Sequence, residues 1–250
     1  MTTPRDWDAA TYERLAAPIT AMGVDVLDRL VLAGDETVLD AGCGTGNVTR
    51  VLLERLPRGR VIAVDGAPSM VEQARELLPP EVEVRQADLL ELALAQPVDA
   101  VLSTATFHWI LDHDRLFARL HAALMPGGRL VAQCGGHGNV DEIKQAGLDA
   151  ASEQPFAAHF EGWDGDWMFA TPQATEQRLI AAGFSDVWCW LTRVDADPGD
   201  PVGYLRGICF GSFLARLPEE LREPFVAAAV QRLPKPLVIH YVRLNILARA

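Results

Sequence analysis

The sequence predicts an α/β fold built on a parallel sheet, and three observations support this. Short apolar runs alternate with segments of helical periodicity through the middle of the chain, which is the pattern of βαβ units. A glycine-rich turn at residues 42–46 separates the first strand from the first helix of this pattern. The chain has 250 residues, of which 49% are hydrophobic, enough for the core of a single large domain.

Seven strands are expected where short apolar runs are bounded by turn residues. Their ranges in chain order are 37–40, 60–65, 82–85, 98–103, 129–133, 187–194 and 237–247. The first strand precedes the glycine-rich turn, and Pro126, Gly127 and Gly128 lead into the fifth. The last strand alternates apolar and polar side chains, which is typical of a strand buried on one face.

Helices are expected where apolar side chains recur at helical spacing. Their ranges are 18–32, 47–56, 68–78, 112–125 and 171–182. Pro68 suits the first turn of its helix, where a missing backbone N–H is tolerated. Acidic residues in the first turn of the fourth helix suit the helix dipole. Gly183 follows the last helix, where glycine readily adopts the left-handed conformation that ends a helix.

These elements divide the domain into three parts. Residues 1–32 form an N-terminal helical segment, and residues 33–194 with 237–250 form the α/β core. Residues 195–236 are helical in pattern and stand between the sixth and seventh strands. Because open α/β sheets bind ligands at the carboxyl ends of their strands, we expect this insertion to form a helical lid over a ligand.

Composition limits the classes of partner. The net charge is -12 at pH 7, which disfavours nucleic acid and anionic membranes, although residues from 201 onward carry seven Arg and Lys against three Glu. No apolar run approaches the ~20 residues of a membrane span, and no secretory signal is visible. The four cysteines lack the paired spacing of a zinc site or a disulfide framework. We therefore expect a cytoplasmic protein without a metal site, of undetermined oligomeric state.

The sharpest motif is the segment 38–46, Val-Leu-Asp-Ala-Gly-Cys-Gly-Thr-Gly. Gly42, Gly44 and Gly46 follow a hydrophobic strand and let a ligand approach the backbone without a Cβ in the way. A dinucleotide fingerprint would require glycine at position 47 or 49, where the chain has Asn and Thr. No Gly-Lys-Ser/Thr phosphate loop is present either. The turn therefore does not favour pyrophosphate.

Three aspartates end or follow successive expected strands at the same edge of the sheet. Asp65 is placed to accept both hydroxyl protons of a ribose, and Asp88 to accept a hydrogen bond from an exocyclic amine such as that of adenine. Asp40 is placed to meet a cationic ammonium group. Each alone is as readily a helix cap or a solvated side chain, but three of them beside a glycine turn predict a nucleoside site.

This arrangement resembles the class I S-adenosylmethionine-dependent methyltransferases. The resemblance covers about residues 37–133 and rests on the glycine segment, Asp65, Ala87-Asp88-Leu89 and the segment 124–128, Leu-Met-Pro-Gly-Gly. It implies a Rossmann-like, seven-stranded, mostly parallel sheet with helices on both faces and an antiparallel final hairpin. It also implies S-adenosylmethionine as the cofactor. The expected cofactor-binding residues are Tyr12, Asp40, Gly42, Cys43, Gly44, Gly46, Asp65, Gly66, Met70, Asp88, Leu89 and Thr104.

A narrower resemblance is to small-molecule carboxylate methyltransferases of the trans-aconitate type. Trp7-Asp8 with Tyr12, and Phe107-His108-Trp109-Ile110 after the fourth strand, are similar to segments of those enzymes. The resemblance implies methyl transfer to a small molecule, to a carboxylate or a hydroxyl, with Tyr12 folding over the cofactor. The alternatives are a nicotinamide oxidoreductase on a related fold, which positions 47 and 49 disfavour, and a cofactor-binding protein without transferase activity.

His108 is the candidate general base. A carboxylate acceptor is already anionic and gains most from positioning, whereas a hydroxyl or amine acceptor would recruit a base. The alternative, which we favour, is that His108 only shapes or hydrogen-bonds the site. His113 and His121 are expected to be solvated or to cap a helix, and Trp188 and Trp190 to pack in the core or on the sheet.

Four further residues are expected at the acceptor, and three of them have an alternative reading. Trp109 would form a wall, and Trp163 and Trp167 would line the acceptor pocket or pin their glycine- and aspartate-rich loop to the body. The planar guanidinium of Arg206, in the insertion, suits a carboxylate. Its alternative is a salt bridge to the acidic body of the protein.

Overall fold

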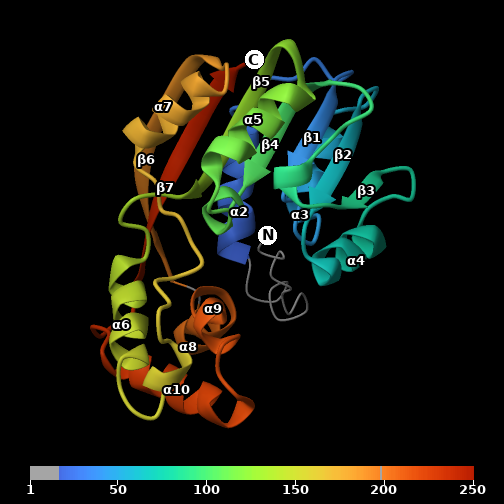
Figure 1. The fold of residues 1–250 in the computed structure, drawn as a ribbon. Coiled ribbons are helices and arrows are strands. Elements are labelled where there is room, and N and C mark those ends of the chain that lie inside the picture. The colour runs from blue at the N-terminus through green and yellow to red at the C-terminus, as the bar shows by residue number, and fades with distance from the viewer. Residues whose placement is uncertain (1–16, 198) are drawn as a thin grey trace.

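A computed structural model describes residues 17–197 and 199–250, in which seven strands form one sheet (Figure 1). The order across the sheet is β3-β2-β1-β4-β5-β7-β6. Strands β1 to β5 pair in parallel, and β7 runs antiparallel to both β5 and β6, which confirms the predicted topology. The strands are β1 (Thr37–Ala41), β2 (Arg60–Asp65), β3 (Glu83–Gln86), β4 (Val98–Thr104), β5 (Leu124–Gly135), β6 (Ser185–Ala196) and β7 (Ile239–Arg249).

Helices follow the parallel strands and cover both faces of the sheet. The α-helices are α2 (Ala17–Leu27), α3 (Asn47–Glu54), α4 (Pro68–Leu77), α5 (His113–Ala123), α6 (Asp141–Ala151), α7 (Pro172–Ala181), α8 (Pro201–Tyr204), α9 (Gly211–Leu214) and α10 (Glu219–Gln231). The short 3₁₀ helices are η1 (Leu89–Glu91), η2 (Phe107–Trp109) and η3 (Ala157–His159), and a π-helical turn, η4 (Leu205–Cys209), joins α8 to α9. None of the helices in the described ranges is long and apolar enough to cross a bilayer.

Successive side chains of the parallel strands point into two different cores, because side chains alternate between the faces of a sheet. On one face, Val38 packs with Leu27 of α2 and Leu52 of α3. On the other face, Leu39 packs with the layer that contains Phe117 of α5. All five of these side chains are fully buried, and each contributes roughly 1.5–3 kcal/mol of hydrophobic stabilisation. The two layers hold the carboxyl ends of β1 to β5 at one edge of the sheet.

Several element boundaries differ from those expected. The N-terminal helix ends at Leu27, and the helix expected at 112–125 ends at Ala123. Strand β5 is longer than expected and includes the Pro-Gly-Gly segment, because Gly127 and Gly128 exchange backbone hydrogen bonds with Ala250 beyond the end of β7. Helix α6 was not expected, since its buried face is made largely of alanine and glycine and gives a weak apolar stripe.

The segment between β6 and β7 packs with α6 around a third core. Phe213 of α9 and Phe225 of α10 are buried there together with Ala150 of α6. Figure 1 shows α6, α8, α9 and α10 gathered beyond the ends of β6 and β7, beside the carboxyl edge of the parallel strands. The insertion is helical as expected, although β6 continues to Ala196, two residues into the range assigned to the insertion. The position of this group provides a second wall facing the strand ends.

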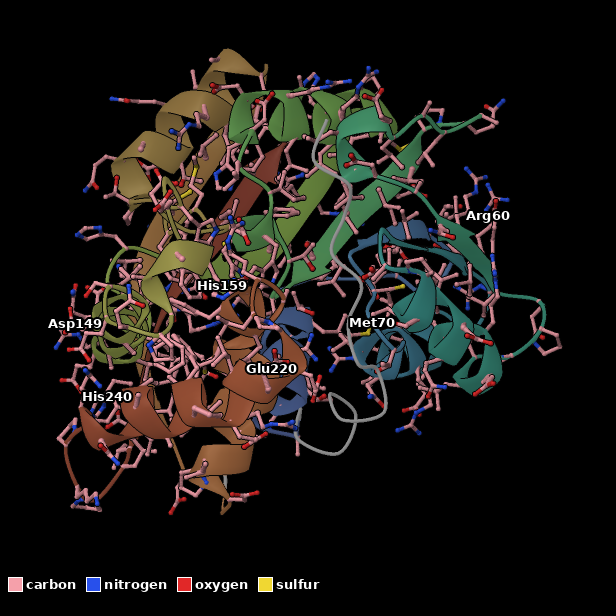
Figure 2. The ribbon with its side chains drawn as sticks, turned by 60° about the horizontal axis from the view of Figure 1, so that its bottom comes forward. Arg60, Met70, Asp149, His159, Glu220 and His240 are labelled. Atoms are coloured by element: carbon pink, nitrogen blue, oxygen red, sulfur yellow. The ribbon has the colours of Figure 1, made fainter. Side chains whose placement is uncertain are left out.

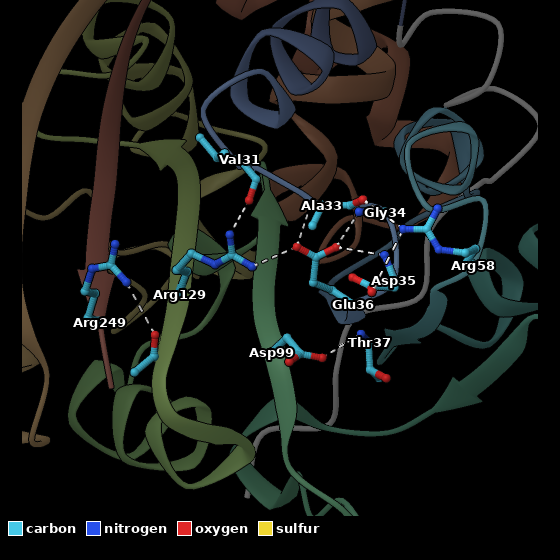
Figure 3. A network of polar contacts seen from close by, with 11 residues as sticks. Val31, Ala33, Gly34, Asp35, Glu36, Thr37, Arg58, Asp99, Arg129 and Arg249 are labelled. Atoms are coloured by element: carbon cyan, nitrogen blue, oxygen red, sulfur yellow. Dashed lines mark hydrogen bonds and ion pairs between the residues drawn. The ribbon is translucent and has the colours of Figure 1, made fainter.

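The opposite edge of the sheet is tied together by Glu36 (Figure 3). Its carboxylate accepts hydrogen bonds from the backbone N–H groups of Ala33 and Gly34, each at 2.8 Å, and of Asp35 at 3.2 Å. It also pairs with Arg129 of β5 at 3.3 Å. Burial opposes ionisation, but these donors outweigh it and lower the pKa of Glu36 from 4.5 to about 2. The turn before β1 is thereby joined to β5.

Candidate functional site

A cavity of about 830 Å³ lies at the carboxyl ends of the parallel strands. This volume is in the upper part of the range for small-molecule sites. Figure 2 shows Met70 on the side of α4, and His159 and Glu220 on the side of α6 and the insertion. The side that carries Met70 contains the wall formed by the strand ends. Its predicted cofactor-binding residues are Gly42, Gly44, Asp65, Gly66, Met70, Asp88, Leu89 and Thr104, all of which line the cavity.

Gly42 and Gly44 are required in the turn for different reasons. Gly42 and Gly44 have φ angles of +86° and +56°, a region that favours glycine. A Cβ on Gly42 would stand 2.1 Å from the Thr106 hydroxyl oxygen, so Gly42 is required by the close approach of Thr106. A Cβ on Gly44 would meet no atom within 4 Å, because that side of Gly44 faces open space. Gly44 therefore leaves a cradle that a side chain would fill.

Asp65 connects two of the loops at this edge. One carboxylate oxygen accepts from the Gly44 N–H at 2.9 Å and the other from the Ala67 N–H at 2.9 Å. Burial raises the pKa of Asp65, and these backbone donors partly offset that effect. Asp88 accepts from the Leu90 N–H at 2.9 Å and caps η1 while lining the cavity. Two carboxylates and an open glycine turn fit the hydroxyl and amine groups of a nucleoside.

Three predicted residues stand behind the described wall of the cavity. Cys43 is buried and Gly46 packs against Leu78. The buried Asp40 accepts a hydrogen bond from the Thr49 hydroxyl at 2.6 Å, and burial raises its pKa to about 6. Asp40 thus braces α3 against β1 and does not face a ligand ammonium group. Tyr12 lies outside the described residues.

His108 lines the other half of the cavity, and the rest of its side chain is buried in the protein. Its Nδ1 accepts a hydrogen bond from the Gly135 N–H at 3.2 Å. Burial, together with the charge of Arg243, lowers the pKa of His108 well below 6.5, so the ring is neutral and its proton stands on Nε2. Since one nitrogen already accepts and the other carries the proton, His108 is a hydrogen-bond donor. The geometry contradicts the role of general base.

Arg243 is a site residue that sequence reasoning missed. It lies on β7, is 3% exposed and lines the cavity. Its Nε donates to Gln133 Oε1 at 3.2 Å, and its guanidinium carbon stands 5.7 Å from the centre of the Tyr241 ring. Its charge also depresses the pKa of His108. The available signal was an arginine in the middle of a mostly apolar strand.

The aromatic residues expected at the acceptor divide into two groups. Trp109 and Trp167 line the cavity as predicted. Trp163 stands behind the described wall, with its ring centre 5.4 Å from that of Trp167 and 4.9 Å from that of Phe213. Its indole nitrogen donates to Asp166 at 2.9 Å. Trp163 therefore supports the wall from behind.

Arg206 also stands outside the described wall. Its Nε pairs with Glu223 of α10 at 2.6 Å, and its side chain is 46% exposed. The structure thus contradicts the substrate-binding role of Arg206. A salt bridge was the stated alternative, but the partner lies within the insertion and not in the acidic body.

The other histidines and tryptophans with an expected position lie away from the cavity. His113 is buried, not solvated, and its Nε2 donates to the Phe107 carbonyl at 2.9 Å. His121 packs edge-on against Phe184. Trp188 is 59% exposed and stacks on Trp190 on the outer strand β6, so this pair covers the sheet surface and not the core.

The comparisons with known proteins agree with this geometry. The family described as "Methyltransferase domain" matches residues 38–128. A trans-aconitate 2-methyltransferase of Azoarcus sp. (strain BH72) is 35% identical over 226 residues, covering 89% of this chain and 87% of that protein. The chain belongs to the class I S-adenosylmethionine-dependent methyltransferases. A trans-aconitate 2-methyltransferase of Acidovorax sp. (strain JS42) is 30% identical to this methyltransferase, covering 91% of the chain and 89% of that protein.

Solved structures show the same fold at lower identity. Phosphoethanolamine N-methyltransferase 2 of Haemonchus contortus, in complex with S-adenosyl-L-methionine, is 19% identical with a TM-score of 0.61, covering 96% of this chain and 56% of that chain. Mycolic acid cyclopropane synthase CmaA1, complexed with SAH and CTAB, is 15% identical with a TM-score of 0.61, covering 99% and 97%. The predicted family is therefore confirmed, with S-adenosylmethionine as the cofactor of this methyltransferase. The nicotinamide oxidoreductase alternative is wrong.

Proposed function

We propose that this methyltransferase transfers the methyl group of S-adenosylmethionine to a carboxylate oxygen of a small-molecule acid. The observation that carries the proposal is the buried guanidinium of Arg243, which lines the cavity next to the neutral ring of His108. A planar guanidinium matches a carboxylate with two parallel hydrogen bonds. The names of the relatives support it, because trans-aconitate carries carboxylates.

The chain's residues have separable tasks in this proposal. Asp65 accepts from the ribose hydroxyls, Asp88 accepts from the adenine amine, and the open face of Gly44 receives the amino-acid part of the cofactor. Arg243 holds the acceptor carboxylate, and the Nε2–H of His108 donates a further hydrogen bond to it. The insertion covers the acceptor as a lid.

The cofactor supplies an electrophilic methyl group on a positively charged sulfur. The protein's part is alignment, which is worth roughly 7–11 kcal/mol when two reactants are well oriented. A carboxylate has a pKa of about 4 and is ionised at neutral pH, so no protein group has to remove a proton. One carboxylate oxygen forms the new bond to carbon as the carbon–sulfur bond breaks, which leaves a neutral ester and a neutral thioether. The reaction therefore needs no general base, which agrees with the assignment of His108 as a hydrogen-bond donor.

The test is methyl transfer from radiolabelled S-adenosylmethionine to a panel of small acids, followed by alkaline hydrolysis of the product. A methyl ester releases labelled methanol under these conditions, whereas a methyl ether or methylamine does not. We expect Arg243→Gln to raise the acceptor KM by about 10–100-fold, the range for loss of hydrogen bonds to a charged group, with unchanged cofactor affinity. Arg206→Gln is the matched control, because that arginine lies outside the described wall. A base-stable product, or an unchanged KM in Arg243→Gln, would overturn the proposal.

A further inference from the structure

We infer that the preferred acceptor is a monocarboxylic acid with an apolar body, aromatic or aliphatic, and not an acid with several carboxylates. This inference rests on the proposed carboxylate transfer and adds the class of acid. It differs from what the names of the trans-aconitate relatives would indicate for this chain. Two independent observations carry it, the charges in the acceptor half of the cavity and the rings that line it.

The acceptor half is the part of the cavity around His108, Trp167, Phe169, Phe213 and Arg243. Its charged side chains suit one carboxylate. Among the described lining residues of this half, the charged side chains are those of Arg243, Lys144 and Asp166. The Lys144 ammonium is paired with Asp141 at 2.7 Å. Asp166 would repel a second carboxylate, and its oxygen already accepts from an indole N–H. A tricarboxylate would therefore bring two further anionic groups to a wall whose lysine already has a carboxylate partner, and each would lose water without gaining a partner.

Another lining cation, Arg115, belongs to the cofactor half of the cavity. Its Nε donates to the Leu90 carbonyl at 3.0 Å, and its guanidinium pairs with Glu91. Both partners lie on η1, directly after Asp88. Arg115 thus shapes the nucleoside end of the cavity and adds no cation at the acceptor.

The wall that continues from His108 is a series of rings. Phe169 stands 5.8 Å from His108, Trp167 is 6.3 Å from Phe169, and Phe213 is 5.7 Å from Trp167, all measured between ring centres. The angles between successive planes are 30°, 25° and 38°. Further apolar side chains that line the cavity near these rings are Val140, Ile143, Ile208 and Phe210. A flat or extended apolar body anchored at Arg243 would run along these rings.

Two glycines make room for these rings. A Cβ on Gly135 at the end of β5 would stand 2.7 Å from a ring carbon of Phe169. A Cβ on Gly147 of α6 would stand 2.7 Å from a ring carbon of Phe213. The backbone therefore approaches both rings as closely as glycine permits. The rings are set by the scaffold before an acceptor binds, so the apolar wall is a preformed part of the site.

The experiment compares kcat/KM for four acids with radiolabelled S-adenosylmethionine: cinnamate, indole-3-acetate, octanoate and trans-aconitate. We expect the best monocarboxylate to exceed trans-aconitate at least tenfold. Preference for trans-aconitate would overturn this inference and leave the proposed carboxylate transfer standing. Transfer to none of the four acids would overturn both.

Two variants test the wall itself. Phe213→Leu is expected to raise the KM for the preferred monocarboxylate several-fold, with the melting temperature recorded to show that the insertion remains folded. Trp167→Arg adds a cation to the wall and is expected to shift the kcat/KM ratio toward trans-aconitate at least tenfold. Trp188→Ala, on the outer surface of β6, is the control and leaves both that KM and that ratio unchanged. An unchanged ratio in Trp167→Arg would overturn the inference.

Discussion

The Nε–H of Arg243 donates a hydrogen bond to the side-chain oxygen of Gln133 at 3.2 Å, so a residue of β5 fixes a side chain of β7. Gln133 in turn donates from Nε2 to Asn245 Oδ1 at 2.7 Å, and Arg29 donates to the same oxygen at 2.5 Å. The Nδ2 group of Asn245 donates to Thr192 at 3.0 Å. These bonds define the orientations of the Gln133 and Asn245 side-chain amides. They also connect the Arg243 guanidinium in the cavity to Thr192 on the outer strand β6.

This chain of amides predicts the effect of Gln133→Leu. The substitution removes the bond that orients Arg243 but leaves the guanidinium in place, so we expect the acceptor KM to rise about 5–20-fold, less than the loss of a direct hydrogen bond to a charged group. Cofactor affinity stays unchanged because Gln133 lies outside the nucleoside half. Steady-state kinetics with calorimetry of cofactor binding measure the two effects separately. Equal acceptor KM values in the variant and the native protein would remove Gln133 from this role.

The proton position on His108 predicts a flat pH profile. Burial and the charge of Arg243 keep its pKa well below 6.5, so the ring stays neutral as the pH rises from about 6 to 8. A carboxylate acceptor is also fully ionised in that range. We expect kcat/KM to change less than about twofold across it. A rise following a group of pKa near 6.5 would indicate that His108 titrates during turnover.

Replacing His108 separates a hydrogen-bond donor from a base. His108→Gln retains an N–H donor near the position of Nε2 and is expected to keep activity within about tenfold of the native enzyme. His108→Phe keeps the ring but has no donor, and we expect a larger loss, seen mainly in the acceptor KM. Equal, near-complete loss of kcat in both variants would indicate that His108 acts as a general base.

Asp65→Ala is expected to weaken S-adenosylmethionine binding by roughly 1.5–3 kcal/mol, the scale of hydrogen bonds to a charged acceptor. The structure adds a second consequence, because the same carboxylate holds the N–H groups of Gly44 and Ala67. Asp65→Asn keeps one oxygen acceptor and is expected to fall between the alanine variant and the native protein. Calorimetry with both folded variants checks this order. Native affinity in Asp65→Ala would contradict the assignment.

Acid stability depends on Glu36. A carboxylate whose pKa is lower in the folded protein stabilises the fold above its unfolded pKa, and this contribution is lost as pH falls through the folded value. For Glu36 this window runs from its ordinary 4.5 down to about 2. We expect the free energy of unfolding of the native protein to fall by on the order of 1–3 kcal/mol more than that of Glu36→Gln over this window. Urea denaturation at several pH values measures the difference, and parallel curves would contradict it.

The insertion is expected to become protected when the site is filled. Ile208, Phe210 and Phe213 line the cavity, so an acceptor bound with the demethylated cofactor contacts the insertion directly. We expect amide hydrogen exchange in residues 201–217 to slow in that ternary complex and to change less with the cofactor product alone. Exchange in α4, whose Met70 lines the nucleoside half of the cavity, should respond to the cofactor product alone. Unchanged exchange in residues 201–217 would show that the insertion does not act as a lid over the acceptor.

Local patterns in the sequence identified most of the residues that line the cofactor half of the cavity, although Asp40, Cys43 and Gly46 lie behind its wall. The glycine turn, Asp65 and Asp88 each follow a strand, so their positions depend on short segments and on the parallel arrangement of neighbouring strands. The acceptor half depends on contacts between distant segments. Arg243 reaches the cavity only because β7 lies beside β5, and its position in a mostly apolar strand does not by itself reveal that pairing. The tautomer of His108 is likewise set by a backbone N–H at the end of β5.

The separate core of the insertion and α6 has a consequence for how such enzymes diversify. The residues that pack around Phe213 and Phe225 form a cluster distinct from those under the two faces of the sheet. Substitutions in the acceptor wall can therefore accumulate while the nucleoside-binding residues stay in place, because the free-energy cost of each change falls on a core separate from those under the sheet. A mutant library confined to 141–170 and 201–217 would accordingly explore new substrates at constant cofactor affinity.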